Sequence, residues 1–220
     1  MQAGWFWGWT DEDSGTGIDE DELAELLGEQ HYQMIQACAF EDFLCRRVGP
    51  KNRNVIDDYL DQRAWKESIP GRDYLRVLRD SVMSLYEVVE VKPGWGLVLR
   101  DLIRGGAPIE VDERIGSESL VGWDLIATRI LTIGGRAYLS GAVLHFPREP
   151  ADAVMRIFRD GPERARRSMP NELPSLTATQ RRAVDEVLGD KTVALEVGMR
   201  VFTSVWLAYT IGQLTRRRRA

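Results

Sequence analysis

Five short segments in the middle of the chain are rich in β-branched, leucine and aromatic residues and are separated by glycines. Their ranges are Leu85–Lys92, Leu97–Leu102, Ile109–Ile115, Leu125–Ile133 and Ala137–Phe146. Glycine adopts positive φ at no steric cost, which tight turns between strands need. Short strands at this spacing predict a meander that curls into a sandwich or small barrel. We therefore expect a small antiparallel β-barrel of the SH3 or OB type, with five to six strands.

The polarity within these segments indicates which strand faces are covered. Ile109–Asp112 alternates apolar and acidic residues, as expected for a strand with one face in water. Leu97–Leu99 and Ile130–Leu131 are continuously apolar, so these strands are expected to be covered on both faces. The flanking segments are the obvious cover.

Apolar residues at helical spacing occur on both sides of the central stretch. The expected helices are one that starts after Ile18, Glu29–Val48, Val55–Trp65 with Asn54 as its cap, Arg72–Val82, Ala151–Phe158, one ended by Gly189, and Val193–Leu214. Gly161 and Pro162 are expected to break the chain after Phe158. The predicted class is α+β, with an N-terminal arm and helices over 1–83, the barrel over 84–147 and C-terminal helices over 148–220. These parts are expected to form one integrated domain.

The last helix raises the question of a membrane span. Its uncharged part, Val201 to Leu214, has 14 residues, whereas a span needs roughly 20 apolar residues. A core or interface helix is therefore expected. The first residues lack a basic region followed by an apolar one, so no secretory signal is expected. Two cysteines do not form a disulfide scaffold, and a cytoplasmic location fits them.

The sequence contains no motif that identifies a catalytic site. Phosphate loops, dinucleotide-binding glycine patterns and nucleophile elbows are all missing. His31, Cys38 and Cys45 share one helical face, but each step of seven residues separates them by roughly 10 Å. They are therefore not expected to bind one metal, and both cysteines are interpreted as small buried apolar residues. We expect no cofactor, and the sequence favours a protein that is not an enzyme.

Aromatic residues near the two ends are the candidates for binding a partner. The residues expected to contact a partner protein are Trp5, Phe6, Trp7, Trp9, Trp206 and Tyr209. The N-terminal group has two possible roles, since it can pack on the protein itself or dock on a partner. Base stacking is less favoured there, because Asp11, Glu12 and Asp13 follow directly and repel phosphate.

Charge is unevenly distributed along the chain. Residues 1–83 hold 9 Lys and Arg against 17 Asp and Glu, whereas residues 148–220 hold 14 against 9. This asymmetry allows the two ends to pair with each other, or the basic end to face an anionic partner. The candidate contacts to nucleic acid are Arg164, Arg166, Arg167, Arg181, Arg182, Arg216, Arg217, Arg218 and Arg219.

Several segments resemble a group of bacterial proteins that carry a SEC-C motif. The similarity lies in Ser84–Val91, Gly96–Leu102, Leu120–Arg129 and Leu139–Gly141, with helical pieces at Phe40–Leu44 and Ile56–Leu60. It covers roughly residues 38 to 158. That group is named for a short cysteine-rich zinc-binding tail, which this chain lacks, so the resemblance implies no metal site. It implies a barrel flanked by helices and no particular activity.

Three hypotheses follow. The first is a non-catalytic binding or scaffolding subunit of a larger assembly, which contacts a partner protein or a second copy through the aromatic arm and the last helix. The second is a nucleic-acid-binding accessory protein that uses the C-terminal arginines, although a pI of 5.3 disfavours strong autonomous binding. The third is an enzyme whose carboxylates converge from the third helix and the barrel.

Overall fold

The structure, a computed structural model, describes residues 20–168 and 189–219. Its centre is a closed barrel of five strands: β1 (Ser84–Lys92), β2 (Gly96–Asp101), β3 (Ile109–Asp112), β4 (Leu125–Ile133) and β5 (Arg136–Phe146). The α+β class and the small barrel between helical segments are confirmed. Each expected strand is present, although β3 ends at Asp112 rather than at Ile115.

The barrel is mixed rather than wholly antiparallel. Its strands follow the order β1-β2-β3-β5-β4, and β1 pairs with both β2 and β4. A closed ring of five strands cannot alternate in direction all the way round, so one neighbouring pair must be parallel. That pair is β3 and β5, where Val111 lies opposite Ala137. This order, with the short helix α6 (Gly116–Ser119) between β3 and β4, is that of the OB type rather than the SH3 type.

Side chains from all five strands fill the barrel interior, and the fully buried ones come from β1 to β4. Its fully buried apolar residues are Tyr86, Val88, Leu97, Leu99, Val111 and Ile126. At the start of β2 the backbone of Gly96 lies against β3, where a Cβ atom would stand 2.3 Å from the carbonyl oxygen of Val111. Only glycine allows this approach. The barrel end formed by the β1–β2 turn and β3 therefore depends on Gly96.

The N-terminal helices begin close to the expected positions. They are α2 (Glu20–Leu27), α3 (Glu29–Cys45), α4 (Val55–Arg63), the 3₁₀ turn η1 (Ala64–Lys66) and α5 (Ile69–Arg79). Asn54 is confirmed as the cap of α4: its side chain accepts from Asp57 N at 3.0 Å, and Asp57 accepts from Asn54 N at 3.1 Å. Helix α5 begins earlier than expected because Ser68 caps it and Pro70 fits the first turn.

The C-terminal helices differ from the expected ones in two places. Helix α7 (Arg148–Ser168) continues through Gly161 and Pro162, so the predicted break there is wrong. A proline removes one hydrogen bond and bends a helix without necessarily ending it. The predicted last helix is divided at Gly198 into α9 (Lys191–Val197) and α10 (Met199–Arg219). A Cβ atom at Gly198 would lie 2.9 Å from the ring of Phe158, so glycine allows α7 to pack closely there.

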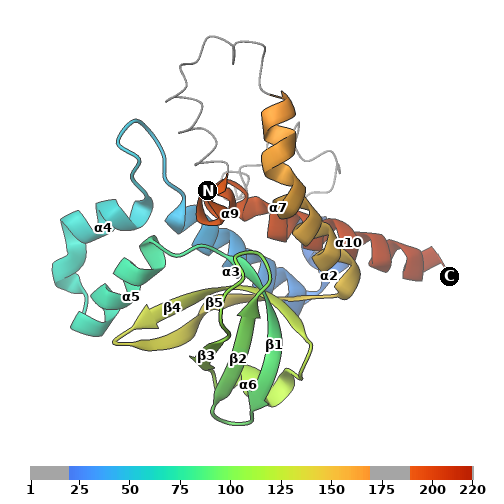
Figure 1. Ribbon diagram of the computed structural model, residues 1–220, viewed down its shortest axis with the longest axis horizontal. Helices are drawn as coiled ribbons and strands as arrows, with labels where there is room; N and C mark the ends of the chain where they lie inside the picture. Colours follow the sequence, from blue (N-terminus) through green and yellow to red (C-terminus); the bar gives the residue numbers. More distant parts are fainter. Residues whose placement is uncertain (1–19, 169–188, 220) are drawn as a thin grey trace.

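Helices from both ends of the chain pack on one side of the barrel (Figure 1). They share a core with the outward faces of β1, β4 and β5. Its most buried members are Ile35, Cys38, Leu85, Ala127, Leu144, Val154, Leu195 and Phe202. On β4, Ala127 faces these helices whereas Ile126 faces the barrel interior, so this strand is covered on both faces as expected. Within the described residues, no helix has the length and apolar character that crossing a bilayer requires.

Candidate functional site

Arg129 lies in the middle of β4 with none of its side chain exposed. Its Nη2 donates to Asp42 Oδ1 at 2.5 Å, and its Nη1 donates to the carbonyl oxygen of Ser81 at 2.7 Å. Nε lies 3.5 Å from Glu41 Oε2 and makes no hydrogen bond. Glu41 accepts instead from Ser140 Oγ at 2.8 Å and from the backbone N of Ala142 at 3.2 Å. These contacts attach α3 to β4 and β5.

One buried guanidinium in this cluster faces two buried carboxylates. Burial raises the pKa of Asp42 to about 6, and the Arg129 charge opposes that rise. Burial also raises the pKa of Glu41, against hydrogen bonds from Ser140 and Ala142 and the charge of Arg129. The cluster therefore holds a proton more readily than the same groups do in the unfolded chain.

We expect the free energy of unfolding to decrease between pH 4 and pH 6 because of Asp42. Its folded pKa of about 6 exceeds the ordinary value of 3.8, so its stabilising contribution is complete below pH 3.8 and is lost as the pH rises through 6. The difference is on the order of 3 kcal/mol. Urea unfolding at several pH values should show a flatter profile for Asp42→Asn than for the wild type. Equal slopes would contradict this assignment.

The cluster is structural rather than a binding site, because a ligand cannot reach Arg129. Cys38 and Cys45 lie near it, and both are buried and free, which confirms their interpretation as small core residues. Burial raises the pKa of both thiols, that of Cys45 to about 11. Their reactivity is therefore low. Among the residues the structure describes, no group of three or more His, Cys, Asp or Glu is placed to bind a metal.

A cavity of about 930 Å³ opens at one end of the barrel, which we call the barrel mouth. It lies between the β1–β2 turn, β3, the connection after β3, and the start of β5. Its lining residues that carry side-chain chemistry are Lys92, Trp95, Glu110, Asp112, Arg114, Arg136 and Tyr138. In barrels of the OB type, the β2–β3 face and the β1–β2 and β4–β5 loops bind oligonucleotides and oligosaccharides. The barrel mouth lies at that position.

Charges of both signs surround the barrel mouth. Lys92 pairs with Glu110, and Arg136 Nη2 lies 2.6 Å from Asp112 Oδ2. The hydrogen bond to Glu110 raises the pKa of Lys92, and the close carboxylate of Asp112 raises the pKa of Arg136, so both remain cations. Arg114 is exposed and forms no ion pair with any described residue. The mouth therefore holds three cations against two carboxylates.

Trp95 gives the barrel mouth an exposed aromatic surface. It lies in the turn between β1 and β2 and is 81% exposed. Helix α6 holds this turn in place, because Gly94 N donates to Ser117 Oγ at 3.0 Å. Tyr138, on β5, is half-buried in the same cavity. An indole held over a partly cationic cavity is suited to stacking on a planar ligand.

The aromatic residues expected to bind a partner are placed differently from one another. Trp5, Phe6, Trp7 and Trp9 lie outside the described residues. Trp206 is 4% exposed, and its indole Nε1 donates to the carbonyl oxygen of His145 at 2.9 Å. Its ring therefore belongs to the core of the chain. Tyr209, one turn later on α10, is half-buried.

Seven of the arginines expected to contact nucleic acid lie near the ends of α7 and α10, which point in different directions (Figure 1). Arg164, Arg166 and Arg167 lie near the end of α7, and Arg164 is exposed. The last turns of α10 contain Arg216, Arg217, Arg218 and Arg219, the first two exposed. Arg181 and Arg182 lie outside the described residues. The described arginines therefore belong to two separate helix ends.

Two groups in the structure were not identified from sequence, and each had a signal. Arg129 is a lone charge within the apolar segment Leu125–Ile133, a pattern that indicates a buried ion pair. Trp95 stands between two glycines in a predicted turn, where a large aromatic residue has little of its own chain to pack against. The barrel mouth itself had no sequence signal, because its residues come from four separate segments.

Comparison with curated proteins and with solved structures finds no match. Residues 35–168 match a family described as a family of unknown function, DUF7986. This range contains the segment that resembles SEC-C motif proteins, and that resemblance stays a prediction. Since the match includes the last part of α3, the whole barrel and α7 and extends over more than half of the sequence, the chain belongs to the DUF7986 family.

Proposed function

We propose that this protein is a non-catalytic binding module whose barrel mouth holds a single-stranded nucleic acid. The observation that carries the proposal is the exposed Trp95 beside a 930 Å³ cavity with three cationic side chains. A stacking platform combined with positive charge is how barrels of the OB type hold single strands without reading their sequence. The free, buried thiols suit a cytoplasmic location for this function.

The ion pairs at the mouth do not prevent phosphate binding. Lys92 and Glu110 are solvent-exposed, with side-chain exposures of 41% and 68%, and Arg136 is 69% exposed, whereas Oδ2 of its partner Asp112 is buried. Exposed pairs contribute little, about 0–1 kcal/mol, so a phosphate competes for Lys92 at small cost and approaches Arg136 from its exposed side. Arg114 adds a cation without a described ion-pair partner. With a pI of 5.3 for the whole chain, affinity is expected to be modest and to fall with salt.

Replacing Trp95 with alanine is expected to weaken binding of a mixed-sequence single-stranded DNA by roughly 5- to 150-fold. Stacking of one base on an aromatic side chain contributes about 1–3 kcal/mol by alanine substitution. Fluorescence anisotropy with a labelled 15-nucleotide strand at low ionic strength measures the effect.

Arg114→Gln should reduce the slope of log affinity against log salt by about 0.7, since one phosphate contact is lost.

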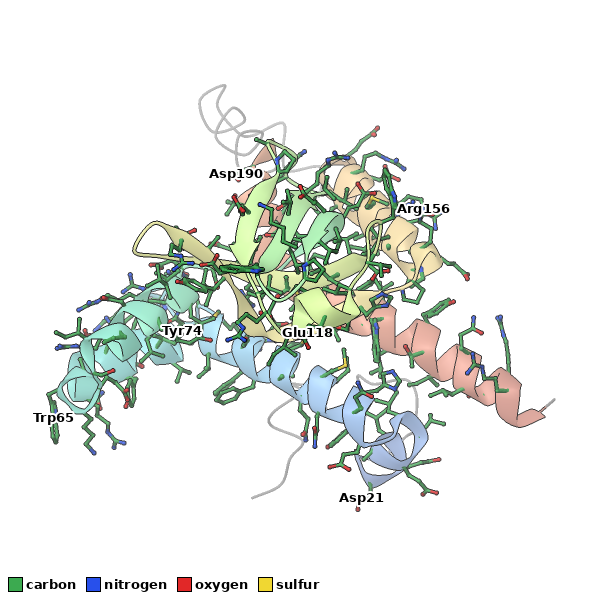
Figure 2. The ribbon with its side chains drawn as sticks, turned by 90° about the horizontal axis from the view of Figure 1, so that it is seen from below. Asp21, Trp65, Tyr74, Glu118, Arg156 and Asp190 are labelled. Atoms are coloured by element: carbon green, nitrogen blue, oxygen red, sulfur yellow. The ribbon has the colours of Figure 1, made fainter. Side chains whose placement is uncertain are left out.

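Trp65 provides a matched control for Trp95. It is 76% exposed and lies in η1. Figure 2 shows it far from Glu118 of α6, the helix to which the turn that contains Trp95 is bonded. Trp65→Ala should leave binding unchanged. The alternative is that the C-terminal arginines bind the strand, and it is tested by a variant with glutamine at Arg216, Arg217, Arg218 and Arg219. If only this variant loses affinity, the C-terminal arginines hold the strand instead of the barrel mouth. Absence of salt-dependent binding at low ionic strength would exclude nucleic-acid binding at both places.

A second candidate function is assembly with a partner protein or a second copy of the chain. Ile115, Val121 and Trp123 flank α6 and are 83%, 62% and 75% exposed. Trp123 has a φ of 74°, and its N donates to Val88 O at 2.8 Å, so the backbone is fixed in a conformation unusual for a bulky residue. Exposed tryptophan on a fixed loop is typical of residues that dominate protein interfaces.

Light scattering over a range of protein concentrations tests the second candidate for self-association. The full chain, a form without residues 1–10 and Trp123→Ala should then differ in mass. A monomer of unchanged mass in all three would exclude assembly of copies and leave the nucleic-acid function as the proposal.

A further inference from the structure

Four arginines line a second cavity, of about 310 Å³, which the helices enclose rather than the barrel. Arg46 and Arg47 follow the end of α3, Arg79 ends α5, and Arg200 lies in the first turn of α10. All four residues are half-buried. Among the described residues, the only carboxylate that lines this cavity is that of Glu196. Positive charge therefore dominates its wall.

Two of the four arginines have anionic partners beside the cavity. Asp80 lies 2.6 Å from Arg47 Nη2 and 2.6 Å from Arg79 Nη2, and Asp57 is farther from both. Arg46 and Arg200 form no ion pair with any residue in the described part of the chain. The charge of Arg200 reaches the buried Asp42 only through space, where it opposes the rise in the pKa of that carboxyl. Two half-buried guanidinium groups thus lack a close counter-ion among the residues that the structure describes.

The shape and chemistry of the cavity indicate the class of ligand. Planar guanidinium groups match the oxygen geometry of phosphate and bind it with paired hydrogen bonds. Asn52 and Ser81 add polar atoms to the wall, and Cys45 and Val82 add an apolar side. A volume of 310 Å³ is at the lower end of the range of about 300–1,000 Å³ for ligand pockets. The cavity therefore suits one small molecule and not a polymer.

We propose that this cavity binds the phosphate group of a small phosphorylated molecule, with Arg46 and Arg200 as its principal charge partners. Arg200 belongs to α10, and Arg46 joins α3 to α4. A bound phosphate would therefore connect the C-terminal helix to the N-terminal helices and raise the temperature of unfolding. This site is separate from the barrel mouth and shares none of its residues.

Isothermal titration calorimetry at low ionic strength tests the site with inorganic phosphate and with ribose 5-phosphate. We expect saturable binding of one molecule per chain by the wild type, and roughly tenfold weaker binding by Arg46→Gln and by Arg200→Gln. Tighter binding of ribose 5-phosphate would assign the site to organic phosphates, and equal binding would assign it to phosphate alone. Either result supports the proposal.

Arg156→Gln is the matched control, because Arg156 is exposed on α7 and does not line this cavity. Figure 2 shows it on the opposite side of the view from Tyr74 of α5, the helix whose last residue, Arg79, lines the cavity. It should bind phosphate like the wild type, and so should Trp95→Ala. The proposal is overturned by an absence of saturable binding, by unchanged affinity in Arg46→Gln and Arg200→Gln, or by an equal loss in Arg156→Gln. Circular dichroism of each variant shows that it is folded, so a lost signal reports on the site.

Discussion

Arg129→Met is expected to lower the free energy of unfolding by about 3–5 kcal/mol, because it leaves a buried carboxylate without its counter-ion. The Arg129 side chain is fully buried, and it bonds Asp42 of α3 and the backbone of Ser81 before β1. Methionine fills a similar volume, so the loss of charge and hydrogen bonds dominates the effect. Urea unfolding followed by tryptophan fluorescence at pH 7 measures it.

Two comparisons make this result specific to the ion pair. Arg156→Met removes an exposed charge and should change stability by less than about 0.5 kcal/mol. Combining Arg129→Met with Asp42→Leu removes both charges of this ion pair and leaves Glu41 with its hydrogen bonds from Ser140 and Ala142. The double variant should recover much of the lost stability, as apolar replacements of buried ion pairs often do. A decrease below about 1 kcal/mol for Arg129→Met alone would show that the cluster contributes little.

The barrel was predictable because its signals are local. Strand composition and the glycines of the turns, such as Gly94, Gly134 and Gly135 with positive φ, depend on neighbours along the chain. The parallel contact between β3 and β5 is not local, because it follows from closing five strands into a ring. The predicted break at Gly161 and Pro162 also used only local preference, which the surrounding helix overrode.

The candidate sites were less predictable than the fold. At the barrel mouth, Trp95 and Arg136 come from turns about 40 residues apart, and only ring closure brings them to one cavity. In the helical cavity, Arg46, Arg79 and Arg200 belong to three separate helical segments. The sequence predicts the helix, strand or turn to which each of these residues belongs. It does not predict which of them line the same cavity, because tertiary packing decides that.

Trp206 illustrates this limit, since an aromatic residue on an apolar helix can face either a partner or the core. The structure places it in the core between α3 and the end of β5. Its ring centroid lies 5.7 Å from that of His31, and its indole N–H bonds His145 O. A large apolar side chain with one satisfied polar atom is typical of an interior anchor. The residue therefore contributes to stability, and its replacement has a measurable cost.

Trp206→Ala is expected to lower the free energy of unfolding by about 3–5 kcal/mol, since it leaves a cavity between α10 and the barrel and an unpaired carbonyl at His145. Tyr209→Ala, on the same helix but half-buried, should cost less, and Trp206→Phe should cost an intermediate amount because it keeps most of the packing but loses the hydrogen bond. Chemical unfolding of the three variants establishes the order. If Trp206→Ala left stability unchanged while Tyr209→Ala lowered it strongly, α10 would be held by its other face, and Trp206 would be available to a partner as its sequence position first indicated.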